Sequence, residues 1–226
     1  MSGGFVLIPI LFVVIVIAAA IYNYIAAEKR RQALYEMARR LGLRFSAGED
    51  YAIPDHYAFL DHLNQGENRY AFNVMSGAYQ QNEVLIFDYH YETHSTDSKG
   101  NRTTSDYYLS FLILLLPVDF PKLKISREGL LSKIAQAFGY DDIDFESAEF
   151  SRVFCVRSPD KKFAYDVCNA SMIEYLLANC DMSIEIERNA LALLFKKRLA
   201  VERVEFDLQR LLEIRLRLPE YLFTKV

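Results

Sequence analysis

Four polar side chains alternate along one predicted strand and could together bind a metal ion. They are Asp88, His90, Glu92 and His94, in the segment DYHYETH. Alternate residues of a strand share one face, so two carboxylates and two imidazoles would line up as ligands for zinc or another divalent ion. Neighbours on that face stand about 7 Å apart. One ion could therefore contact only two of these side chains, and other elements would have to supply the remaining ligands.

The same alternation has a simpler interpretation, which we prefer. Phe87, Tyr89 and Tyr91 would form a buried face, and the polar side chains opposite them would be solvated. We therefore predict no metal, no cofactor and no catalytic residue. The alternative is a metal-dependent hydrolase that uses Asp88, His90 and His94.

Other chemical motifs are weak or missing. Asp141, Asp142, Asp144 and Glu146 lack the glycine and the twelve-residue spacing of a calcium-binding EF-hand loop, so we interpret residues 143–146 as an acidic edge strand. The sequence contains no GxSxG, GxxxxGK[ST], GxGxxG or HExxH. An enzyme is therefore the less favoured class.

The other elements predict an α+β fold of antiparallel sheet with packed helices. Strands at 69–78 and 83–93 flank a turn at 79–82, and a third strand at 107–116 ends at Pro117, the start of a connector to Pro121. The remaining predicted elements are a helix from Ser126 to Phe138, a strand at 153–157, helices at 161–167 and 170–179, a hairpin of strands 183–187 and 190–196, and a helix at 201–217.

Several stretches resemble a family of uncharacterised bacterial membrane-anchored proteins. The shared pattern is FDYxYxT, then LP, FGxxDIDFE and EFSR, within about residues 33–218. The resemblance implies a cytoplasmic domain of unknown function behind one or more N-terminal membrane helices. It implies no activity, cofactor or catalytic residue. The pattern includes Asp88 but not His90 or His94, which speaks against a shared metal site.

The N-terminus predicts a retained membrane anchor. Residues 5–27 carry no charge, and as a helix they would span about 34 Å, enough for a bilayer core of about 30 Å. Tyr22 and Tyr24 lie at the end of this segment, where aromatic side chains meet the membrane surface. A cleaved signal peptide is the alternative, but residues 1–4 lack the basic residues that it requires.

The charges that follow the anchor predict its orientation. Residues 28–44 hold six basic and two acidic side chains, whereas 45–226 hold 20 basic and 28 acidic ones. Because positive flanks stay inside, we expect the N-terminus outside and the domain in the cytoplasm of a bacterial inner membrane. Cys155, Cys168 and Cys180 form no CxxC pair and fit a reducing compartment. The acidic body excludes nucleic-acid binding.

We thus predict three parts: an anchor (1–27), a basic juxtamembrane helix (28–44) and one cytoplasmic domain (45–226), with 45–125 and 126–226 as optional sub-lobes. The leading hypothesis is a non-catalytic interaction or scaffold domain that contacts a protein partner or its own copies. A module that responds to anionic lipid is a further alternative. The predicted lipid contacts are Tyr22, Tyr24, Lys29, Arg30 and Arg31. The predicted interaction surface comprises Ser95, Asp97, Lys99, Asn101, Arg102, Asp141, Asp142, Asp144 and Glu146.

Overall fold

The computed structural model describes residues 4–98, 100–127 and 142–224, with side chains from residue 10 onward. The helices are α1 (Gly4–Leu41), α2 (Ala52–His56), α3 (Ala148–Val153), α4 (Lys161–Val167), α5 (Ala170–Ala178) and α6 (Val204–Arg217). The 3-10 turns are η1 (Asp61–Asn64), η3 (Val201–Arg203) and η4 (Glu220–Leu222). The strands are β1 (Arg44–Ser46), β2 (Glu67–Tyr79), β3 (Asn82–Thr96), β4 (Arg102–Arg127), β5 (Phe154–Arg157) and β6 (Ser183–Phe195).

The six strands form one antiparallel sheet, and the predicted α+β class is confirmed. The order is β1-β2-β3-β4-β5, with β6 also paired to β4. The predicted turn between the first two long strands is also confirmed. Gln80 and Gln81 both have positive φ angles, of 46° and 65°. Such a two-residue turn matches the twist of the strands that it joins.

Each face of the sheet has its own hydrophobic core. On one face, the sheet packs against α1, α6 and the group α3–α5, through buried side chains such as Leu34, Phe150, Met172 and Leu208. On the other face, α2 and η1 cover the aromatic side of β3. Phe87, Tyr89 and Tyr91 are buried there, as predicted from their alternation. The sheet is therefore the central layer to which every described helix is attached.

Short side-chain caps fix where the helices between β5 and β6 begin. The Asp160 carboxylate accepts the backbone N–H of Phe163 at the start of α4, and the Asn169 side chain accepts that of Met172 at the start of α5. Each cap satisfies a backbone donor that has no partner within its helix. Both helices agree with the predicted ranges to within one residue.

The predicted end of the third strand at Pro117 is wrong, because β4 continues through Pro117 and Pro121 to Arg127. Its pairing with β6 is irregular between Leu115 and Phe120 and again between Phe120 and Leu123. A proline is tolerated at such irregular positions, where it removes no regular ladder hydrogen bond.

The predicted hairpin at 183–196 is also wrong, because β6 is one strand that pairs with β4 along its length. Arg188 has a φ of 49° and lies opposite Phe120. This left-handed residue kinks the strand without reversing it, so Arg188 and Asn189 form an irregularity and not a turn.

One predicted element near the middle of the chain does not begin where expected, and another is absent from the described residues. Ser126 is paired in β4 and does not begin a helix, and residues 128–138 lie outside the described residues. Residues 143–146 form no strand. Ile143 donates one backbone hydrogen bond to Val156 (2.8 Å). Phe145 instead packs against Phe150 of α3, and this contact ties the segment to the helix.

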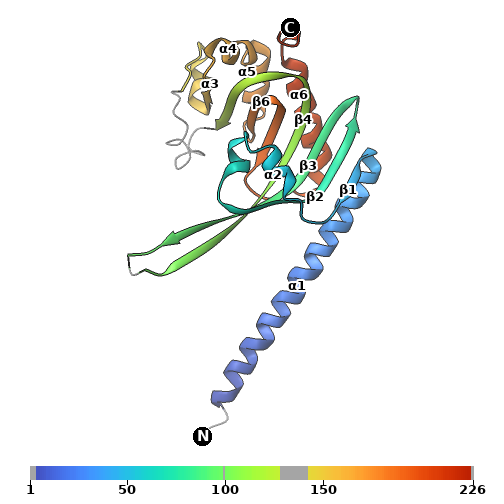
Figure 1. Ribbon diagram of the computed structural model, residues 1–226, viewed down its shortest axis with the longest axis vertical. Coiled ribbons are helices and arrows are strands. Elements are labelled where there is room, and N and C mark those ends of the chain that lie inside the picture. Colours follow the sequence, from blue (N-terminus) through green and yellow to red (C-terminus); the bar gives the residue numbers. More distant parts are fainter. Residues whose placement is uncertain (1–3, 99, 128–141, 225–226) are drawn as a thin grey trace.

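The first helix is unbroken. α1 runs through the predicted anchor and most of the predicted juxtamembrane segment. Its part from Ile10 onward is one helix long and apolar enough to cross a membrane. In Figure 1, the N-terminal half of α1 extends away from the sheet, and the β3–β4 hairpin projects from the sheet to one side. The boundaries of the three predicted parts stay predictions.

Candidate functional site

The C-terminal part of α1 is docked on the sheet by an ion pair. Arg30 donates from Nε to Asp88 Oδ2 (3.0 Å) and from Nη2 to Asp88 Oδ1 (2.9 Å). The side chain of Arg30 is 17% exposed and that of Asp88 is 3% exposed. Two parallel hydrogen bonds from a planar guanidinium to a carboxylate give both strength and a fixed orientation. Arg30 was predicted as a lipid contact, which stays a prediction; the structure places it against β3.

Apolar side chains continue the docking along the same face of α1. Leu34, Met37 and Ala38 follow Arg30 at steps of four, three and one residues and are buried. Residues spaced by three and four share a helix face, so Arg30 belongs to the buried stripe. At the end of the helix, Arg40 pairs with Glu205 of α6 at 2.6 Å. The C-terminal part of α1 is therefore an integral part of the domain.

The Asp88 carboxylate accepts four hydrogen bonds from three residues. Besides Arg30, its carboxylate accepts from Asn73 Nδ2 (3.1 Å) and from Ser110 Oγ (2.7 Å). Ser110 Oγ in turn accepts the backbone N–H of Leu199 (2.8 Å). Each carboxylate oxygen thus has two donors, and the expectation that Asp88 faces solvent is wrong. The group acts as the junction between α1, the sheet and the segment after β6.

His90 is buried on the same face, one step along β3. Its ring stacks on Tyr70 and lies against Tyr108, with centroids 4.6 and 4.9 Å away. Nδ1 lies 3.1 Å from the carbonyl oxygen of Asn68, and Nε2 lies 2.9 Å from Asp106 Oδ1. Both partners are acceptors. Because a carbonyl oxygen can only accept, Nδ1 donates to Asn68, and Nε2 is directed at the Asp106 carboxylate.

The structure regroups the predicted metal candidates. Ligand atoms of His90, Glu92 and Asp106 lie within 4.8 Å of one another. His94 belongs to a separate set, with Thr104 Oγ1 at 2.9 Å and Glu67 at 3.4 Å. Asp88 is engaged by Arg30. Sequence reasoning missed Asp106 because it lies on β4 and reaches this group only through the pairing of Glu92 with Asp106.

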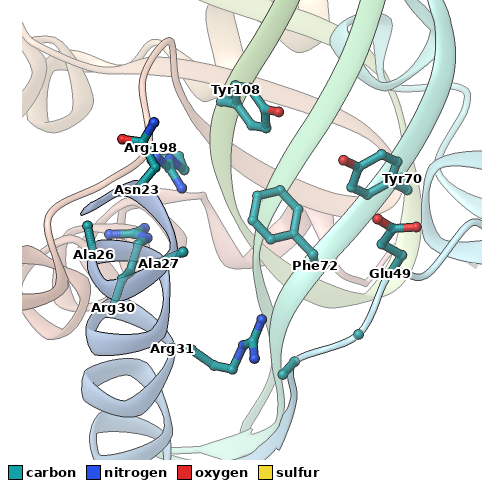
Figure 2. Close-up of a pocket in the computed structure, with 12 residues that line it drawn as sticks. Asn23, Ala26, Ala27, Arg30, Arg31, Glu49, Tyr70, Phe72, Tyr108 and Arg198 are labelled. Carbon is teal, nitrogen blue, oxygen red and sulfur yellow. The ribbon is translucent and has the colours of Figure 1, made fainter. Parts of the chain in front are cut away.

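A cleft of about 740 Å³ opens between α1 and the sheet beside these residues. Asn23, Ala26, Ala27, Arg30 and Arg31 form its α1 wall. Opposite them lie Tyr70 and Phe72 of β2 and Tyr108 of β4, with Glu49 and Arg198 at the margins (Figure 2). Tyr70 and Tyr108 are the two rings that pack against His90. These tyrosines therefore separate the cleft from the buried His90.

Comparisons with known proteins bear on the fold. No protein-family model matches the chain, and no curated protein matches it. The crystal structure of the mycobacterial trehalose monomycolate transport factor A, TtfA, aligns with a TM-score of 0.57 and 13% sequence identity. The alignment covers 85% of this chain and 96% of that chain. At this identity the likeness shows a shared fold, so the family resemblance of residues 33–218 stays a prediction.

A second polar cluster lies on the opposite face of the sheet and was missed by sequence reasoning. Lys122 Nζ contacts Asp61 Oδ1 at 2.5 Å and Glu187 Oε2 at 3.3 Å. Lys124, Glu185 and His62 are buried beside them. Lys122 and Lys124 are two residues apart, as are Glu185 and Glu187, so each pair lies on one face of its strand and could have indicated this cluster. It went unnoticed because it needs the pairing of β4 with β6.

Burial changes the protonation of this cluster. Burial and the nearby Glu185 raise the pKa of Asp61 to about 6, although Lys122 opposes the shift. Burial and the positive charge of Lys124 lower the pKa of His62 to about 3. Neither ring nitrogen of His62 has a hydrogen-bond partner within the described residues. His62 is therefore neutral at physiological pH and serves the packing of η1 on the sheet.

The other predicted lipid-contact and interaction residues differ in exposure and in pairing. Tyr22, Tyr24 and Lys29 are exposed, and Arg31 forms an exposed ion pair with Glu28 (2.9 Å). In the β3–β4 hairpin, Ser95, Asp97, Asn101 and Arg102 are exposed, and so are Asp144 and Glu146 in the later segment. Asp142 is exposed but pairs with Arg157 at 2.7 Å. Lys99 and Asp141 lie outside the described residues.

Proposed function

We propose that this protein is a single-pass, membrane-tethered, non-catalytic interaction domain. It holds a protein partner, or a second copy of itself, at the inner face of a bacterial cytoplasmic membrane, with its N-terminus outside. Tethering raises the effective concentration of weak contacts, so a small binding surface is sufficient. The helix α1 supplies the tether, and its docking by Arg30 and Asp88 fixes the orientation of the domain.

The observation that carries the proposal is the β3–β4 ribbon, which extends beyond the rest of the sheet (Figure 1). Strand β2 pairs with β3 only as far as Glu92, whereas β3 and β4 remain paired out to Thr96 and Arg102. The backbone edges of the ribbon beyond Glu92 therefore have no strand beside them among the described residues. Such edges can pair with an added strand from another chain. The polar side chains protect the ribbon from indiscriminate aggregation.

Shortening the ribbon tests this role. In the full chain, residues 95–103 are replaced by Asn-Gly, which closes the strands at the cross-strand pair His94–Thr104. The matched control replaces Gln80-Gln81 by Asn-Gly at the opposite end of β3. Partners are crosslinked in cells and identified after purification in mild detergent. We expect the shortened ribbon to lose partners that the control keeps. An identical set of partners in both variants would refute the role of the ribbon.

A divalent-cation site is the second candidate, carried by the convergence of His90, Glu92 and Asp106. The carbonyl of Asn68 fixes Nδ1 of His90 as a donor and directs Nε2 toward the carboxylates, as in many metal-binding histidines. Metal analysis of the purified full chain tests this candidate. Bound zinc or manganese that disappears in His90→Ala, but not in His94→Ala, would favour it over a purely structural histidine.

A further inference from the structure

The cleft beside α1 lies where this helix would leave the membrane. Asn23, Ala26, Ala27 and Arg30 line it at steps of three, one and three residues, so they form one stripe of the helix. Asn23, Ala26 and Ala27 lie at the end of the uncharged segment 5–27, and Arg30 follows it. The two alanines leave room beside the helix. Any membrane that α1 crosses therefore presents its lipid headgroups at the mouth of this cleft.

The wall opposite α1 is aromatic. Phe72 packs against Tyr70 and Tyr108, with ring centroids 5.8 and 6.3 Å away. Tyr108 is 43% exposed. This wall offers an apolar surface with phenolic hydroxyls, which suits the glycerol and ester region of an amphiphile. A small soluble anion would leave most of this surface uncovered.

Two arginines give the cleft a cationic edge. The guanidinium of Arg198 lies 5.4 Å from the ring centroid of Tyr108, and among the described residues no carboxylate pairs with it. Arg31 pairs with Glu28, but both side chains are about half exposed, and such pairs are weak and exchangeable. Arg31 points from α1 toward the strand that carries Phe72 (Figure 2). Arg30 is neutralised by Asp88.

One carboxylate offsets this charge in part. Glu49 also lines the cleft, and its Oε2 accepts a hydrogen bond from the Tyr51 hydroxyl at 2.8 Å. With Arg30 neutralised, Arg31 and Arg198 outnumber Glu49. The cleft thus combines a positive edge, an aromatic wall and a position beside the bilayer.

We propose that the cleft binds the headgroup of an anionic phospholipid from the leaflet where α1 leaves the membrane. The phosphate is held by Arg31 and Arg198, the glycerol region lies against Phe72 and Tyr108, and the acyl chains return to the bilayer along α1. Guanidinium groups bind phosphate through charge-assisted hydrogen bonds. This lipid site depends on the same anchor as the proposed function but requires no protein partner.

Native mass spectrometry of the full chain in mild detergent tests the site. Phosphatidylglycerol and phosphatidylcholine are added in separate titrations. We expect phosphatidylglycerol to be retained about tenfold better, and the double variant Arg31→Ala/Arg198→Ala to lose this preference. Arg152→Ala is the control, because Arg152 is an exposed arginine on α3. Equal retention of the two lipids, or an unchanged preference in the double variant, would overturn the proposal.

Two additional measurements distinguish lipid binding in the cleft from lipid binding elsewhere and from a site for soluble phosphate. Ala27→Phe fills the cleft without changing any charge, and we expect it to reduce phosphatidylglycerol retention while the melting temperature is maintained. Unchanged retention in this variant would place the lipid elsewhere.

Glycerol phosphate, which lacks acyl chains, should not displace the lipid at equal concentration. Displacement of the lipid by glycerol phosphate at that concentration would indicate a site for soluble phosphate. The variant with the shortened ribbon should still bind phosphatidylglycerol. A failure of the proposed interaction role can therefore be distinguished from a failure of the proposed lipid site.

Discussion

The guanidinium of Arg30 binds the carboxylate of Asp88 through two hydrogen bonds between residues 58 positions apart in the chain. This contact turns the end of an apolar helix into part of the folded domain. The domain is therefore attached to α1 by two hydrogen bonds and an ion pair in the C-terminal part of this helix.

Removing the two partners of this ion pair should have unequal effects. Arg30→Met leaves the Asp88 carboxylate buried and unpaired, which we expect to cost about 3 kcal/mol of unfolding free energy. Asp88→Asn leaves a guanidinium that can still reach water in the cleft, and we expect it to cost about 1–2 kcal/mol. The measurement is urea unfolding of the full chain in detergent, followed by circular dichroism, since the protein has no tryptophan. Equal losses would contradict this account.

Asp61 should make the protein less stable as the pH rises. Its pKa is about 6 in the folded protein against an ordinary 3.8, so the folded state binds the extra proton between these values. The free energy of unfolding therefore falls as the pH rises from about 4 to about 6. Relative to Asp61→Asn, the wild type should lose up to about 3 kcal/mol between pH 4 and pH 7. A pH-independent difference between the two proteins would exclude this titration.

His62 should have the opposite effect. Its pKa is about 3 in the folded protein against an ordinary 6.5, so the unfolded state binds the proton first. Stability is fully present above pH 6.5 and falls by about 1.4 kcal/mol per pH unit below it. His62→Phe removes two buried ring nitrogens that have no hydrogen-bond partner within the described residues, and we expect a gain of about 1 kcal/mol at pH 7.5 that grows at pH 5. A variant less stable than the wild type at pH 5 would refute the assignment.

Gly66 should tolerate no side chain. Its φ is +68°, and an added Cβ would lie 2.2 Å from the carbonyl oxygen of Glu92 and 2.6 Å from the Tyr91 ring. We expect Gly66→Ala to cost about 2–4 kcal/mol in the same urea unfolding measurement. The matched control is Gly48→Ala, because nothing lies within 4 Å of a Cβ there. Similar stabilities of the two variants would contradict the close approach of the chain at Gly66.

The orientation proposed from the basic residues after the anchor has a direct test. Green fluorescent protein and alkaline phosphatase are fused in turn to the C-terminus of the full chain. With the domain in the cytoplasm, the first fusion should fluoresce and the second should be inactive. An active phosphatase fusion would reverse the proposed topology, whereas the docking of α1 by Arg30 and Asp88 would be unaffected.

Local features of the fold were predictable where the pattern is strong and continuous. The apolar run of α1, the Tyr79–Asn82 turn and the helices α4 and α5 need only neighbouring residues for their definition. Proline and polar dipeptides misled the prediction. Pro117 and Arg188-Asn189 have the composition of breaks, but the pairing of β4 with β6 accommodates both as irregularities.

The uncharged helix, the alternating faces of β3 and the antiparallel α+β class could be predicted from the amino-acid pattern alone, because these depend on periodicity and charge along a few residues. The contacts of the polar side chains, in contrast, depend on the folded arrangement of the chain. Arg30 is indistinguishable from the other basic residues after the anchor until β3 brings Asp88 beside it. Likewise, His90 meets Asp106, and Asp61 meets Lys122, only through strand pairing and packing. Such contacts depend on which distant segments meet, and the spacing of residues along the chain does not encode that directly.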